Sequence, residues 1–321
     1  MIEKILGFGQ VLWDLTVEVD YSFIEELAIE IGGHRTVEFT IIEDILLKLE
    51  KAQKKVLRNP GGSAANVMSN MAKLGSNTTF CGRHGNDADG YFYMNILESE
   101  GVTPISLIDS KNKTGQLLSL ITPDKDRTFI VYWGASSQLP EDLITIDLLQ
   151  KFNLIHIEGY LIINNEKALW KIFNNASKIT FDLAAVPIIT RMRPVLQEMM
   201  KKNPPYILFA NFTEGGAFTE KNDPKEILQE MIKYSEIAVL TLGEKGVMVQ
   251  TKNGDFHYQE AIETDLVDTT GAGDAFSAGF LHEYLQSKDI RKASVLGVKV
   301  ASKTISKFGA RSFQIEQLNN E

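Results

Sequence analysis

Short apolar runs that alternate with helical segments constrain the fold of this 321-residue chain more than any other feature. Most of the runs are rich in Ile, Leu, Val and Phe, which is typical of strands that are buried on both faces. They occupy residues 5–9, 78–82, 154–158, 179–183, 206–210 and 237–241. Because parallel strands must be joined by a crossover, which is usually a helix, the sequence predicts an α/β fold with a doubly wound, mainly parallel sheet flanked by helices.

Two regions interrupt this alternation and predict a small lid within a single domain that spans residues 1–321. They are residues 15–40 and 115–134, and in the second of them two β-rich runs flank the turn-like sequence Pro123-Asp-Lys-Asp. We expect segments of both regions to form a small β-sheet. An exposed sheet of this kind can bury its outer face against a second copy, which makes the lid a candidate surface for a homodimer. Residues 27–59 contain no pattern to which a role can be assigned.

The charge and composition of the chain favour a small-molecule partner. A formal net charge of -9 argues against a general affinity for nucleic acid, which depends on clustered Lys and Arg. No apolar run reaches the roughly 18 residues of a membrane span, and the first residues do not read as a secretory signal. The single cysteine, Cys81, cannot form an intramolecular disulfide. A cytoplasmic protein that binds neither nucleic acid nor membrane is therefore expected.

Residues 268–274, Asp-Thr-Thr-Gly-Ala-Gly-Asp, place two glycines where a long helical stretch begins. At such a helix start the amide N–H groups of Ala272, Gly273 and Asp274 are free to bind an anion, and Gly271 and Gly273 allow a phosphate to approach the backbone. Asp274 beside that anion is a candidate base for an attacking hydroxyl, with a pKa that the helix N-terminus is expected to lower. The simpler alternative is that this carboxylate only marks the start of the helix.

A second glycine pair precedes an amphipathic helix that is expected over residues 63–74, with Ser63 as its N-cap. The pair lies in Pro60-Gly61-Gly62-Ser63-Ala64-Ala65-Asn66, which is followed by Gly82-Arg-His-Gly-Asn-Asp-Ala-Asp-Gly. These segments and the Asp-Thr-Thr-Gly-Ala-Gly-Asp string resemble the two signatures of the ribokinase-like (PfkB) carbohydrate and nucleoside kinases. The resemblance implies an ATP-dependent phosphotransferase that acts on an alcohol group of a sugar or nucleoside. No P-loop or protein-kinase motif is present.

The resemblance implies four groups of site residues. Catalysis is expected at Asp274, Gly271, Ala272, Gly273 and, from the lid, Arg127. The acceptor is expected to contact Asp14, Gly61, Gly62 and Asn66. ATP is expected to contact Asn211, Thr241, Gly243, Gly246 and Gly273. Glu214 is expected to bind Mg²⁺ through water, and some relatives bind a monovalent cation such as K⁺ at the positions of Asp268 and Thr270.

Plainer alternatives remain open for several of these residues. Asp14 also suits a turn, and Glu214 also suits a solvated loop. Residues 241–246 also suit a β-turn between two strands. Arg127 also suits an exposed turn, although a guanidinium that arrives on closure is well matched to phosphate oxygens.

The identity of the acceptor is less constrained than the reaction. Residues 122–128, 133–136, 157–161 and 308–311 resemble the bacterial branch of adenosine-kinase-like and general sugar kinases. This slightly favours adenosine or a ribose-type acceptor. Trp13, Phe129 and Trp133 can stack on a purine or simply form the core of the lid. The alternatives are a hexose kinase, such as a fructokinase, and a sugar- or nucleoside-binding protein that has lost catalysis.

Overall fold

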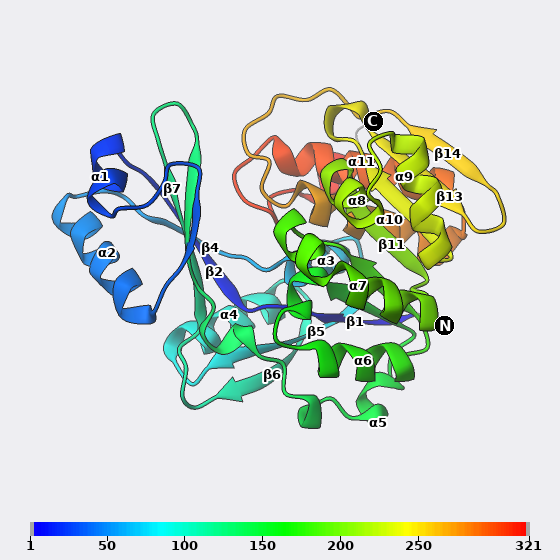
Figure 1. Cartoon of the computed structure of the whole chain (residues 1–321), viewed down its shortest axis with the longest axis horizontal. Helices are drawn as coiled ribbons and strands as arrows, with labels where there is room; N and C mark the ends of the chain where they lie inside the picture. The colour runs from blue at the N-terminus through cyan, green and yellow to red at the C-terminus, as the bar shows by residue number, and fades with distance from the viewer. Residues whose placement is uncertain (1–2, 319–321) are drawn as a thin grey trace.

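A computed structural model describes residues 3–318, which form a large α/β layer and a smaller sheet beside it (Figure 1). In sheet order, the nine strands of the large sheet are β14 (Phe256–Gln259), β13 (Val247–Thr251), β12 (Ile237–Thr241), β11 (Ile207–Asn211), β10 (Ile179–Asp182), β9 (Leu154–Glu158), β1 (Lys4–Phe8), β5 (Asn77–Gly85) and β6 (Thr103–Asp109). All neighbours from β12 to β6 are parallel, and only β13 and β14 are antiparallel. The predicted fold class and all six predicted buried strands are confirmed.

Helices cover both faces of the large sheet. The helices on one face are α3 (Ser63–Lys73), α4 (Ala88–Ser99), α10 (Ala272–Ser287) and α11 (Ile290–Ile305). The helices on the other face are α5 (Ile146–Leu149), α6 (Glu166–Asn175), α7 (Val186–Lys202), α8 (Phe212–Thr219) and α9 (Pro224–Met231). In most of the strands, alternate residues enter the two cores, as Ile237 and Ala238 of β12 do. This burial on both faces explains why the strands are visible in the sequence as continuous apolar runs.

The second sheet has five strands. In sheet order they are β3 (His34–Thr36), β8 (Arg127–Tyr132), β7 (Gly115–Ile121), β2 (Leu12–Glu18) and β4 (Leu57–Pro60). Directly paired residues of neighbouring strands point to the same face of a sheet. Leu15, Leu118 and Ile130 are paired in this way and belong to one buried cluster. Asp14, Asn59 and Leu117 are paired on the opposite face.

The apolar face of the small sheet is covered by two helices of the same chain, α1 (Tyr21–Glu26) and α2 (Phe39–Lys51). Ile42, Ile45 and Leu49 of α2 share the buried cluster with that face of the sheet. Figure 1 shows the two helices on the side of the small sheet that is remote from the rest of the molecule. The face on which a homodimer through the small sheet was expected is thus already occupied.

Two local predictions about helices had different outcomes. The long helix that was predicted to begin at the glycines of residues 268–274 is present as α10, which begins at Ala272. The predicted N-cap Ser63 is wrong, because the cap is Gly62, with a φ of 84°, and Ser63 is the first helical residue. Its hydroxyl is therefore free to bond elsewhere. No helix among residues 3–318 is both long enough and apolar enough to cross a membrane.

Candidate active site

Polar side chains gather at one edge of the large sheet, where the parallel strands end. Glu158, Asp182, Asn211 and Thr241 are the last residues of four adjacent strands, β9 to β12. The order of the strands reverses between β1 and β9, because the chain proceeds from β1 to β5 in one direction and from β9 to β10 in the other. In open α/β sheets, ligands bind outside the carboxyl ends of the strands at such a reversal. The site is therefore expected above β1 and β9.

The helices α3 and α10 meet at this edge, and the carboxylate of Asp274 lies at their junction. Ser63 donates from Oγ to Asp274 Oδ1 at 2.7 Å, and Asn66 donates from Nδ2 to Asp274 Oδ2 at 2.8 Å. Both oxygens of the candidate base are thus held by the start of α3. The two signature segments, which are far apart in the sequence, are brought together at this carboxylate.

The predicted direction of the Asp274 pKa shift is wrong. Burial raises the pKa of Asp274 above its ordinary value, although the hydrogen bonds from Asn66 and Ser63 and the charge of Arg311 act in the opposite direction. The prediction considered the helix N-terminus but not the loss of water around the carboxyl. A raised pKa makes Asp274 a stronger base than the sequence suggested.

The backbone at the start of α10 provides an open anion site. Ala272 donates its amide to Thr269 O at 3.2 Å, whereas the amides of Gly273 and Asp274 have no acceptor among residues 3–318. A Cβ on Gly273 would meet no atom within 4 Å, so space remains in front of these amides. Gly271 has a φ of 72°, and a Cβ there would lie 2.2 Å from Ala310 Cβ. Gly271 is therefore required by the fold, and Gly273 leaves room for a ligand.

Asp14 of β2 and the glycine pair that follows β4 lie beside each other on neighbouring strands of the small sheet. A Cβ on Gly61 would lie 2.4 Å from Asp14 Oδ2, so only glycine allows the carboxylate to lie against this backbone. Burial raises the pKa of Asp14 to about 7, with smaller rises caused by the charges of Asp274 and Asp268. Asn66 lies on the same side of α3 as its partner Asp274. The four predicted acceptor residues, Asp14, Gly61, Gly62 and Asn66, are thus close to the candidate base.

Arg127 connects the small sheet to the loop that precedes α10. It donates from Nη2 to Asp268 Oδ1 at 3.2 Å and from Nη1 to Thr270 Oγ1 at 3.1 Å. Asp268 Oδ1 also accepts from the amide and hydroxyl of Thr270, and Oδ2 accepts from the amide of Gly309 at 3.1 Å. The guanidinium already balances the charge of Asp268, so these residues do not fit a monovalent cation well in this arrangement.

The residues expected near ATP follow the ends of β11 and β12. Asn211 caps α8, and its side chain and that of Glu214 form a reciprocal capping box. Thr241 ends β12, and Gly243 and Gly246 both have positive φ in the turn to β13. A Cβ on Gly246 would lie 2.0 Å from Gln259 O, whereas one on Gly243 would meet nothing within 4 Å. Gly246 is required by the turn, and Gly243 borders open space.

Trp13 is not available as a stacking surface. Its side chain is buried, Arg58 lies over the ring at 3.9 Å from its centroid, and Phe92 is stacked with it at 5.8 Å. Phe129 and Trp133 are only partly buried. Of the three aromatic candidates, only these two can still contact a ligand.

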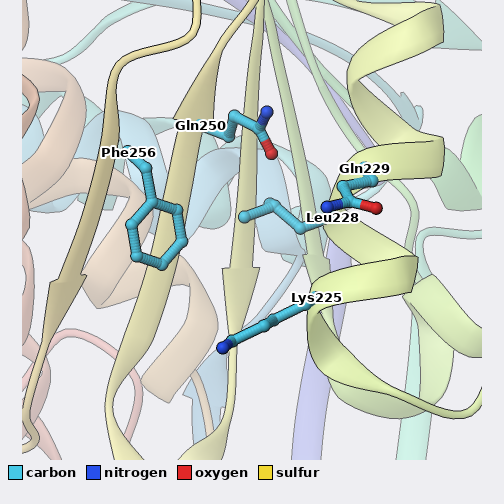
Figure 2. A pocket seen from close by; sticks show the side chains of 5 residues that line it. All are labelled: Lys225, Leu228, Gln229, Gln250 and Phe256. Atoms are coloured by element: carbon cyan, nitrogen blue, oxygen red, sulfur yellow. The ribbon is translucent and has the colours of Figure 1, made fainter.

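A separate hollow lies between α9 and the β13–β14 hairpin (Figure 2). It is lined by Lys225, Leu228, Gln229, Gln250 and Phe256. None of the predicted site residues contributes to it. The chemistry is therefore expected at the carboxyl edge of the sheet and not in this hollow.

Comparison with known proteins identifies the family. Residues 33–317 match the pfkB family of carbohydrate kinases. The chain belongs to this family. An uncharacterized sugar kinase of Archaeoglobus fulgidus is 30% identical over 246 residues, which cover 75% of this chain and 96% of the relative. A probable fructokinase-5 of Arabidopsis thaliana is 28% identical, with 70% of this chain and 73% of the relative covered. This pfkB protein is a phosphotransferase with an alcohol group as acceptor, in the class of sugar and nucleoside kinases.

A solved structure confirms the fold of this pfkB protein. The adenosine kinase from Sinorhizobium meliloti superimposes with a TM-score of 0.85 at 26% identity, and 97% of this chain and 96% of that chain are covered. The similarity thus includes the small sheet as well as the large one.

The pfkB family implies the use of ATP, typically with Mg²⁺, and the residues present fit a magnesium ion. Burial raises the pKa of both Asp182 and Glu214, and the charge of Asp182 raises that of Glu214 further. A divalent cation between these carboxyls and the phosphates would relieve this cost. Within residues 3–318 no group of three or more Asp, Glu, His or Cys side chains is placed to hold a metal ion on its own. Magnesium usually retains several water ligands and binds through one or two carboxylates and the substrate phosphates.

Sequence reasoning missed three charged residues of this pfkB site, namely Glu158, Asp182 and Arg311. Glu158 accepts from the amides of Gln10 and Ala64, both at 2.8 Å, and burial raises its pKa to about 8. Glu158 ends one predicted strand and Asp182 is the penultimate residue of another, and the rule that ligands bind at the carboxyl ends of parallel strands could have found them. Arg311 lies outside every strand and no such rule applies to it.

Proposed function

We propose that the chain transfers the γ-phosphoryl group of ATP to a hydroxyl of a ribonucleoside or a ribose-type sugar, with Asp274 as the base. The observation that carries the proposal is the junction of α3 and α10. There a carboxylate with a raised pKa lies beside two free backbone amides and within reach of the Asp14 and Gly61 surface.

Each residue has a distinct role in this mechanism. Asp14 and Asn66 hold hydroxyl groups of the acceptor, because a carboxylate and an amide together accept and donate hydrogen bonds to a diol. Asp274 takes the proton of the attacking hydroxyl. The amides of Gly273 and Asp274 stabilise the negative charge of the transferred group. Bound Mg²⁺ would supply further charge neutralisation at the phosphates, near Glu214 and Asp182.

The small sheet is proposed to act as a lid over the acceptor. Its inward face carries Asp14 and Asn59 side by side, and Phe129 and Ser119 are paired on the same face. Arg127 joins this sheet to the loop before α10 through two hydrogen bonds. Closure of such a lid excludes water and brings Arg127 next to the phosphate site.

A nucleoside is favoured over a free hexose by the partly exposed aromatic rings at the lid edge. Trp133 donates from Nε1 to Thr36 Oγ1 at 3.3 Å, and its ring lies 6.4 Å from that of His34. Phe129 is directly paired with His34 on neighbouring strands. Three adjacent rings offer a surface on which a planar base can stack. The similarity to the S. meliloti adenosine kinase points in the same direction.

A hexose kinase is the second candidate, because a fructokinase is among the relatives. A nucleoside or ribose kinase is distinguished from a hexose kinase by measuring ADP release with ATP, Mg²⁺ and, in turn, adenosine, ribose and fructose. Highest kcat/KM with adenosine or ribose supports the proposal. Highest kcat/KM with fructose favours the hexose kinase, and ADP release with none of the three would point to a binding protein without catalysis.

A further inference from the structure

Arg311 is a buried arginine that donates hydrogen bonds from all three of its nitrogens. Its side chain is 6% exposed and follows the end of α11. Nε donates to Asn66 Oδ1 at 2.8 Å, Nη1 to Glu100 Oε2 at 2.9 Å, and Nη2 to Gly61 O at 3.0 Å. Two of these three acceptors belong to the proposed acceptor and base region.

The contact with Asn66 fixes which way the amide of that residue faces. A guanidinium has only donors, and an ionised carboxylate has only acceptors. Asn66 lies between one of each, so its oxygen must face Arg311 and its nitrogen must face Asp274. The reversed amide would oppose donor to donor on one side and acceptor to acceptor on the other. Arg311 therefore selects the single orientation of Asn66 in which Asp274 receives a hydrogen bond.

We propose that Arg311 is a positioning residue for catalysis, which acts through Asn66 to hold the carboxylate of Asp274 in the orientation that accepts the proton of the acceptor hydroxyl. This inference rests on the proposed role of Asp274 as the base. Arg311 touches neither acceptor nor phosphate in this scheme. Its effect is transmitted by the chain of two hydrogen bonds from Nε to Asn66 and from Asn66 to Asp274.

A lysine could not replace this arrangement. The planar guanidinium carries donors on three nitrogens and reaches Asn66, Glu100 and Gly61 at once. The ammonium group of a lysine has all its donors on one nitrogen and cannot reach the three acceptors together. Glu100 also accepts from Ser69 Oγ at 2.8 Å, so the counter-charge of Arg311 is itself fixed to α3. Because hydrogen bonds fix both Arg311 and Glu100, the guanidinium can hold Asn66 in one orientation.

The test is a double-mutant cycle between Arg311 and Asn66. The proteins are wild type, Arg311→Gln, Asn66→Ala and the double variant, each checked for folding by thermal unfolding. The kcat is measured with saturating ATP, Mg²⁺ and whichever of adenosine, ribose and fructose turns over fastest. Arg311→Lys is measured in both backgrounds as well, so that the cycle can be completed if the Gln variant does not fold.

We expect Arg311→Gln to lower kcat by about 10- to 100-fold in the wild-type background, because misorientation of a reacting group has costs of this order. In the Asn66→Ala background the same change should lower kcat by no more than about threefold, since the connection is already lost. Arg311→Lys should follow the same pattern, and the KM for ATP should change little. Equal losses in the two backgrounds would show that Arg311 acts independently of Asn66 and would overturn the proposal. So would failure of both Arg311 variants to fold.

Arg193→Gln is the matched control. Arg193 of α7 pairs with Glu220 at 2.8 Å and donates to Ala217 O at 3.1 Å, on the opposite face of the large sheet. Its variant should lower the melting temperature and leave kcat within about twofold. Asp274→Asn separates a failure of the proposed base from a failure of the proposed role of Arg311. If that variant retains full turnover, the proposed base is wrong, whereas if it loses turnover and the Arg311 cycle is additive, only the inference about Arg311 fails.

Discussion

Replacement of Arg127 by Met tests whether the small sheet is a lid that this side chain holds closed. Among residues 3–318, the guanidinium of Arg127 contacts groups outside the small sheet only at Asp268 and Thr270, at 3.2 and 3.1 Å. Met retains a side chain of similar length and removes both hydrogen bonds. The variant should therefore favour the open arrangement without disturbing the sheet itself.

The magnitude follows from the two bonds and their exposure. A hydrogen bond to a charged group contributes about 1.5 to 3 kcal/mol when it is buried. The Arg127 side chain is 37% exposed, although Asp268 is only 11% exposed, so screening by water reduces the sum to about 1 to 2 kcal/mol. The equilibrium between closed and open lid should then shift by about 5- to 30-fold.

Hydrogen–deuterium exchange of the backbone amides in β7 and β8, with and without acceptor, measures this shift directly. The acceptor KM should rise in parallel. Lys125→Gln is the control, because Lys125 lies in the same hairpin and pairs with Glu18 at 2.6 Å, within the small sheet and with both side chains at least 70% exposed. If the amides of β7 and β8 exchange at the same rate in the Arg127 variant, the control and the wild type, the small sheet is not a lid that Arg127 holds closed.

Two further predictions concern the acceptor and the anion site. Burial raises the pKa of Asp14 to about 7, and the ionised carboxylate accepts a hydrogen bond from a hydroxyl more strongly than the protonated form does. The acceptor KM should therefore fall as pH rises from about 6 to 8, and Asp14→Asn should remove this dependence. A KM that is flat with pH in the wild type would contradict the prediction. Gly271→Ala should lower the free energy of unfolding by about 2 to 5 kcal/mol, because Gly271 has a positive φ and a Cβ there would overlap Ala310. Gly273→Ala should leave the melting temperature unchanged and raise the KM for ATP, because a Cβ there would meet no protein atom and would occupy the space in front of the free amides. Equal melting temperatures for the two glycine variants would argue against this assignment.

The sequence was most informative where burial on both faces of the sheet leaves an unambiguous pattern. Strands β9 and β12 have the bounds that were predicted, because most of their residues are apolar. Strand β3 lies within residues 15–40, where part of the small sheet was predicted, but helix α2 and strand β4 were not predicted. In α2, Ile42, Ile45 and Leu49 have helical spacing, but the small sheet that buries them is assembled from distant segments.

The candidate site could be predicted only in part. The residues of the glycine-rich segments were found by their resemblance to a family, but the contact of Ser63 and Asn66 with Asp274 depends on the crossing of two helices that lie far apart in the chain. Arg311 could not have been found, because its importance lies in a hydrogen bond to Asn66 that no local pattern encodes. The predicted direction of the Asp274 pKa shift was wrong for a similar reason, since burial of the carboxyl group depends on the assembled site.

Single-turnover phosphoryl transfer by Asp274→Asn, compared with the wild type at saturating ATP and acceptor, tests the central claim most directly. The substitution preserves size and removes the capacity to accept a proton, so the rate should fall by about 10² or more while acceptor binding stays within a few-fold. An unchanged rate of transfer would show that another group accepts the proton and that the junction of α3 and α10 is not the catalytic centre.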